Sequence, residues 1–204
     1  MKKISVMLLL SAAASNAAVT TFSQVIEANS GTPDTTGLSL VQTFTNATRD
    51  YTGDGIFDTL TYKLVTTSTN GTSDLNNDGA LYPFKTAGGT YNMLLSGIAL
   101  TTVDATYGGT VLMSGALNSY FKSGNGAYSV TDGVNTLAAS ATSVTVTATT
   151  PLVFSDSNAL VWSGNGNNGI RALSVDFTVT TVPEPSSLAL LGIGGLALVG
   201  RRKR

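Results

Sequence analysis

Short stretches of alternating apolar and polar residues run through the middle of this chain. The clearest covers residues 172–182, in which Leu173, Val175, Phe177 and Val179 recur at every second position. Side chains of a β-strand point alternately to its two faces, so this spacing places the apolar residues on one face of a strand. Shorter stretches of the same kind occur at residues 38–44, 59–65 and 143–148.

Turn-forming sequences separate these stretches, among them Gly53-Asp54-Gly55, Gly108-Gly109 and Asp132-Gly133. Thr, Ser, Val and Gly are abundant between them, which favours strands and turns over helices. The apolar run from Met93 to Leu100 is predicted to be a further strand. The sequence therefore predicts an all-β body, folded as a single antiparallel β-sandwich of the jelly-roll type.

The C-terminal end departs from this pattern. Pro183, Glu184 and Pro185 are followed by an apolar run from Leu188 to Val199. The prolines end the preceding strand and hold the chain extended. A basic cluster closes the chain, and it consists of Arg201, Arg202, Lys203 and Arg204. The apolar run can enter a bilayer, whereas the cations stay on its cytoplasmic side.

The order of tripeptide, apolar run and basic cluster resembles the PEP-CTERM sorting signal of Gram-negative bacteria. In that family the Pro-Glu-Pro tripeptide is the recognition site of exosortase, a membrane transpeptidase with a cysteine nucleophile. The resemblance implies that exosortase is a partner and that residues 186–200 hold the chain transiently in the inner membrane. It further implies delivery to the cell surface or the extracellular matrix. The alternative is a buried core helix, because the apolar run is shorter than the roughly 20 residues of a full span.

The N-terminal end has the build of a secretory signal peptide. Lys2 and Lys3 form its charged region, and residues 4–10 form its apolar region. Ser15 and Ala17 are small residues at the positions that signal peptidase requires, so cleavage is expected after Ala17. The sequence thus predicts a signal peptide at residues 1–17, a β-sandwich domain at 18–182 and a sorting tail at 183–204. Both end segments are predicted to form short helices.

Composition excludes several functions for the body. The chain has no His and no Cys, which removes the Ser-His-Asp triad, the Cys-His dyad and His-ligated zinc. Once Lys2, Lys3 and the four terminal cations are set aside, five of the 11 basic residues remain, against 11 of the 12 acidic ones without Glu184. The body therefore carries a net charge of about −6, which argues against nucleic-acid binding. We expect a non-catalytic protein.

Residues 50–58 read Asp-Tyr-Thr-Gly-Asp-Gly-Ile-Phe-Asp and predict a Ca²⁺ site. Calcium takes several oxygen ligands, and Gly55 permits the sharp turn that would bring them together. Phe57 is expected to point into the core and anchor the loop. The expected ligands are the side chains of Asp50, Thr52, Asp54 and Asp58 and the backbone carbonyl of Ile56.

This loop resembles the calcium loops of EF-hand-like, dockerin-like and integrin-propeller proteins. Thr61 stands where the EF-hand has a bidentate Glu, which implies weak binding. The alternative is an Asp/Gly turn in which Asp side chains cap backbone amides. A second, weaker copy has ligand types at Asp74, Asn76 and Asp78, and a plain turn is the preferred interpretation there.

The single tryptophan, Trp162, precedes an amide-rich stretch that contains Asn165 and Asn167. Stacking on the indole, with amide hydrogen bonds, would hold a carbohydrate; packing of the indole in the core is the preferred alternative. Two functions are favoured over a third, an enzyme with paired Asp carboxyl groups, which the absence of His and Cys makes the least favoured. The first is a non-catalytic envelope or extracellular-matrix protein, and the second is a calcium-stabilised carbohydrate-binding module associated with exopolysaccharide.

Overall fold

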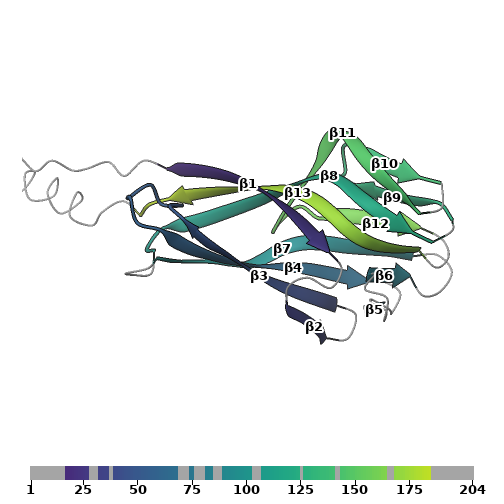
Figure 1. Ribbon diagram of the computed structural model, residues 1–204, viewed down its shortest axis with the longest axis horizontal. Coiled ribbons are helices and arrows are strands. Elements are labelled where there is room, and N and C mark those ends of the chain that lie inside the picture. The colour runs from purple at the N-terminus through teal and green to yellow at the C-terminus, as the bar shows by residue number, and fades with distance from the viewer. Residues whose placement is uncertain are drawn as a thin grey trace, which may run out of the picture.

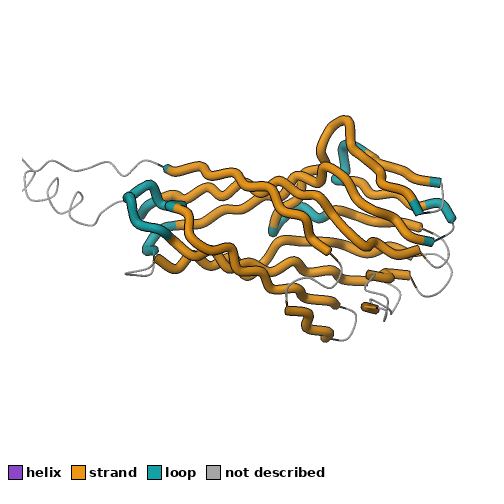
Figure 2. The backbone as a smooth tube through the Cα atoms, in the orientation of Figure 1, coloured by secondary structure: helices purple, strands orange, loops and turns teal. Residues whose placement is uncertain are grey.

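The computed structural model describes residues 17–27, 32–36, 39–68, 74–75, 81–84, 89–102, 107–124, 126–140, 143–164 and 168–184. Every regular element in these ranges is a β-strand (Figures 1 and 2). The described ranges accordingly contain no helix with the length and apolar character needed to cross a membrane. The strands form two antiparallel sheets.

The first sheet is built around the last strand, β13 (Asn168–Val182). One edge of β13 pairs with β8 (Thr110–Ser123), which pairs in turn with β11 (Val144–Ser155). The other edge pairs with β1 (Ala18–Glu27) over residues 172–181 and with β6 (Leu81–Phe84) near its start. The short strand β5 (Asp74–Leu75) adds to β6.

The second sheet has seven strands, which pair in one linear order. Its strands lie in the order β10 (Thr136–Ala139), β9 (Tyr128–Thr131), β12 (Leu160–Gly164), β7 (Gly89–Thr102), β4 (Asp58–Ser68), β3 (Ser39–Arg49) and β2 (Thr32–Thr36).

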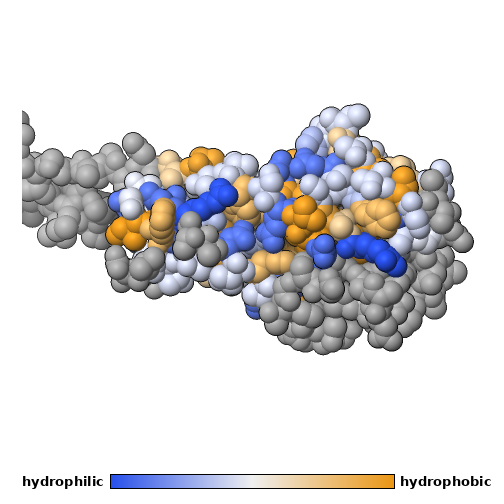
Figure 3. Space-filling model, in the orientation of Figure 1, coloured by the Kyte–Doolittle hydropathy of each residue, from blue (hydrophilic) through white to orange (hydrophobic). Residues whose placement is uncertain are grey.

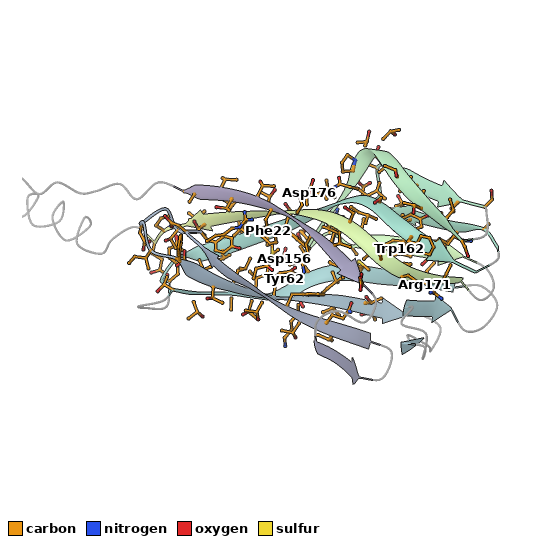
Figure 4. All side chains as sticks on the ribbon, viewed as in Figure 1. Phe22, Tyr62, Asp156, Trp162, Arg171 and Asp176 are labelled. Atoms are coloured by element: carbon orange, nitrogen blue, oxygen red, sulfur yellow. The ribbon has the colours of Figure 1, made fainter. Side chains whose placement is uncertain are left out.

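The buried faces of the two sheets share one hydrophobic core. The ring of Tyr62 on β4 lies 5.1 Å from that of Phe177 on β13, and the ring of Tyr120 on β8 lies 5.2 Å from Trp162 on β12. Tyr62 and Trp162 lie inside the body at separate points along its length (Figure 4). Aromatic rings in such tilted and edge-on contacts bury large apolar areas, so they hold the sheets face to face.

The sequence prediction of an all-β body is confirmed. The alternating residues Leu173, Val175, Phe177 and Val179 are all buried on one face of β13, and the run from Met93 to Leu100 lies within β7. The predicted signal helix and C-terminal helix fall outside the described residues. The jelly-roll topology stays a prediction, since what the strand pairing establishes is two antiparallel sheets.

One end of the body gathers three parts of the chain that are distant in sequence. β1 begins there and β13 ends there (Figure 1), with Ala18 paired to Thr181. The loop between β3 and β4 lies at the same end, because a Cβ on Gly53 would stand 3.6 Å from the Cβ of Ala18. We call this the terminal end of the body.

Candidate functional site

The loop that joins β3 to β4 carries the predicted calcium ligands, and two glycines give it its shape. Gly53 and Gly55 have φ angles of 76° and 87°. Residues with a Cβ are strained in this left-handed region, whereas glycine, which has none, is not. The backbone can therefore fold back tightly over the Asp50 side chain.

Asp50 accepts hydrogen bonds from the loop that follows it. Its Oδ1 accepts from the amides of Gly53 at 2.6 Å and Asp54 at 3.2 Å and from the Thr52 hydroxyl at 3.4 Å, while Oδ2 accepts from the Gly55 amide at 2.9 Å. Desolvation acts to raise the pKa of Asp50, but these donors together lower it below its usual value. The carboxylate is thus ionised at neutral pH and already well supplied with donors.

Asp58, the first residue of β4, is fully buried. Its Oδ2 accepts from the backbone amides of Tyr51 at 2.8 Å and Thr52 at 3.1 Å. Its Oδ1 is buried as well, and it has no hydrogen-bond partner within the described ranges. A buried oxygen without a partner is costly. A small cation or a water at Oδ1 would remove that cost.

Asp54 differs from Asp58 because its side chain is exposed and makes one local bond, from the Ile56 amide to Oδ1 at 2.8 Å. Over the ranges that the structure describes, no three acidic side chains lie together in a group that could hold a metal. The alternative interpretation was an Asp/Gly turn in which Asp side chains cap backbone amides, and the amide bonds to Asp50 are of this kind. The calcium assignment stays a prediction, and the unpartnered Oδ1 of Asp58 is the feature that supports it.

Phe57 does not anchor the loop in the core, which corrects the expectation from sequence. Its side chain is 60% exposed, whereas Tyr51 is buried and lies edge-on to Phe22 with ring centroids 6.4 Å apart. The reason is strand alternation: Asp58 points inward at the start of β4, so its neighbour Phe57 points outward. The Thr181 hydroxyl also donates to the Tyr51 carbonyl at 2.8 Å, which ties the loop to the end of β13.

The weaker second loop is described only in part. Asp74 begins β5, where it is paired with Tyr82. Asn76 and Asp78 lie outside the described residues, so this prediction is untested.

Trp162 is completely buried. Its indole contacts Tyr120 edge-on at 5.2 Å and Tyr128 at 5.6 Å. The indole therefore has no exposed face on which a sugar could stack, and it has the packing role that was the preferred alternative. Asn165 and Asn167 lie outside the described residues.

The predicted sorting signal starts where the sheet ends. Val182 is the last residue of β13 and pairs with Thr110. Pro183 is half-buried and Glu184 is exposed. Pro185 and the basic cluster at residues 201–204 lie outside the described residues.

Comparison with known proteins assigns this C-terminal segment. A family model for the PEP-CTERM protein-sorting motif matches residues 181–204, which confirms the resemblance read from the sequence. The motif implies an exported protein that is held at a membrane, sorted by exosortase and then released. Searches of curated proteins and of solved structures gave no match. The comparisons therefore identify the C-terminal tail as a sorting motif and leave the role of the β body open.

Proposed function

We propose that this protein is a non-catalytic component of the cell envelope or the extracellular matrix of a Gram-negative bacterium. The observation that carries the proposal is the sorting motif, whose match begins at the last two residues of β13. The body lacks His and Cys, the side chains of the commonest catalytic centres, which favours a structural role. Exosortase is the processing partner, and residues 186–200 hold the chain in the inner membrane until it acts.

Two surface pockets of the described part can be compared with the requirements of glycoside hydrolysis. One is lined by residues of β1, β3 and the loop that follows β3, and none of its lining residues is acidic. Another lies on the outer face of the first sheet, with Asp156 as its single acidic residue. Acid–base hydrolysis of a glycoside uses two facing carboxyl groups, and neither pocket supplies such a pair.

Export is tested at the N-terminus of the mature protein. We expect protein purified from the envelope to begin at Ala18, because Ser15 and Ala17 fit the small-residue cleavage rule. Cleavage there also leaves β1 whole, since Ala18 is its first residue. N-terminal sequencing is the measurement. An envelope protein that retains Met1 would contradict export by a cleaved signal peptide, whereas a start at Val19 would shift the site by one residue only.

The carbohydrate-binding alternative keeps exopolysaccharide as a partner but has lost its stacking residue, since Trp162 is buried. A glycan array probed with the purified body, residues 18–182, separates the two functions. We expect no specific glycan to be retained. Selective retention of one polysaccharide class would favour the binding module.

We also propose that Ca²⁺ binds the loop of residues 50–58 weakly and stabilises the body. For an extracellular site without the bidentate Glu, a dissociation constant on the order of 10⁻⁴–10⁻³ M is expected. At a Ca²⁺ concentration ten times the dissociation constant, bound metal adds about 1.4 kcal/mol to the free energy of unfolding. For a domain of this size, the melting temperature should rise by about 3–6 °C relative to EDTA.

Calorimetric scans of the body with Ca²⁺ and with EDTA measure this shift. Asp54→Ala should abolish most of this shift, because it removes a predicted ligand. The Asp54 side chain is exposed, so the substitution should leave the fold itself unchanged. Asp78→Ala, in the weaker loop, should abolish less. A wild-type melting temperature that is the same in Ca²⁺ and EDTA would show that the loop is an ordinary Asp/Gly turn.

A further inference from the structure

The terminal end of the body carries exposed apolar side chains next to the point where the sorting motif begins. Phe57 is 60% exposed, Ile56 38% and Val182 42%. We call these three residues the apolar tip. Large apolar residues at a loop tip lose contact with water when they enter a lipid interface. Figure 3 shows apolar surface at the end of the body where β1 begins and β13 ends.

The loop holds the apolar tip rigidly rather than on a free hairpin. Tyr51 and Thr52 donate their amides to buried Asp58, and the Thr181 hydroxyl donates to Tyr51. These bonds connect both ends of the loop to each other and to the last residues of β13. Ile56 and Phe57 therefore keep a fixed place relative to Val182.

The length of the chain beyond Val182 places lipid close to this tip. Five residues separate Val182 from Leu188, where the apolar run of the tail starts. Even fully extended, they allow at most about 22 Å between the two Cα atoms. The headgroup layer takes up roughly 5–8 Å of that span. A body attached by so short a connection meets the membrane with the end from which the connection leaves.

We propose that the apolar tip docks the body end-on against the outer face of the inner membrane while the tail is inserted. The proposal rests on the tail insertion given above. The occupant is the lipid surface itself, and the attraction is apolar. Asp50 and Asp54 give the loop a negative charge. The neighbouring cation, Arg49, donates to the Thr21 carbonyl and lies over the Phe22 ring, so we assign the attraction to the apolar tip rather than to charge. Docking holds Pro183 and Glu184 at the membrane surface, where a membrane transpeptidase works.

Site-specific fluorescence on the mature chain, residues 18–204, tests the docking, and the absence of cysteine makes each label unique. One reporter is Asp54→Cys, in the loop. The other is Val134→Cys, on the exposed turn between β9 and β10. That turn bonds to Val153, which pairs with Ala116, six residues along β8 from Thr110 at the terminal end. At about 3.4 Å per residue it lies roughly 20 Å away from the tip.

Each labelled chain is reconstituted in EDTA into vesicles of phosphatidylethanolamine and phosphatidylglycerol that contain a headgroup-labelled nitroxide lipid. We expect the Asp54→Cys label to be quenched about twofold more than the Val134→Cys label, because only the first lies at the lipid interface. Adding Ile56→Ser and Phe57→Ser should lower its quenching to the level of the Val134→Cys label. Val153→Ser, which removes an exposed valine elsewhere, should change nothing. High salt should leave the difference intact.

Flotation of the vesicles after an alkaline wash reports tail insertion separately. A chain that does not float would contradict tail insertion and, with it, the docking. A chain that floats but shows equal quenching at the two labels would contradict the docking alone. Loss of the difference in high salt would show that charge rather than the apolar tip holds the body.

Discussion

Replacement of Pro183, Glu184 and Pro185 by alanine should leave the full chain uncleaved at its C-terminus and retained in the inner membrane. The tripeptide lies at the start of the matched sorting motif, directly after the last residue of β13. The prolines keep the segment out of both helix and sheet, and Glu184 is exposed, so a transpeptidase can reach it. We expect loss of processing to be nearly complete. Mass spectrometry of the C-terminus and membrane fractionation measure it.

Pro151→Ala is the matched control for that experiment, because Pro151 is an exposed proline in β11 and outside the motif. Its processing should equal that of the wild type. If the triple variant is also processed as the wild type, the tripeptide is only a linker between the sheet and the apolar run.

The alternation of residues 172–182 was enough to predict both a strand and its buried face, because strand periodicity is a local property. The same holds for the end of β13, since a proline at position 183 cannot donate to the ladder. The sorting motif was readable for a similar reason. Its three parts are contiguous and depend on no contact with the body.

The loop at residues 50–58 shows where local reasoning fails. It holds two aromatic residues, and the sequence does not say which one is buried. Tyr51 is the buried one: its ring lies against Phe22 of β1, and its carbonyl accepts from Thr181, 130 residues away in the chain. Burial of the Asp58 carboxylate is equally unexpected, since acidic side chains are rarely fully buried. Its amide donors come from Tyr51 and Thr52, and only the folded loop places them at its Oδ2.

Trp162 was ambiguous in the sequence for the same physical reason. A tryptophan beside an amide-rich stretch fits either a sugar site or a core, with packing in the core the preferred interpretation. Its ring contacts are Tyr120 on β8 and Tyr128 on β9. These contacts exist because two sheets bring distant strands together, and neighbouring residues carry no sign of them.

Asp58→Ala should destabilise the body strongly even without calcium. The substitution leaves the amides of Tyr51 and Thr52 without their acceptor and opens a small cavity at a fully buried position. Loss of a buried, charge-assisted pair of hydrogen bonds costs about 2–4 kcal/mol. The melting temperature in EDTA should therefore fall by roughly 4–16 °C for a domain of this size.

Asp54→Ala is the matched control for Asp58→Ala, since it removes a carboxylate of the same loop that is exposed and accepts one local bond. Its melting temperature in EDTA should stay close to that of the wild type. Asp58→Asn should recover much of the loss, because the amide oxygen still accepts from the two backbone donors. Thermal scans of the three variants in EDTA separate the structural role of Asp58 from metal binding. Equal losses for Asp54→Ala and Asp58→Ala would contradict the structural role, because burial and amide bonding of Asp58 would then contribute nothing beyond its charge.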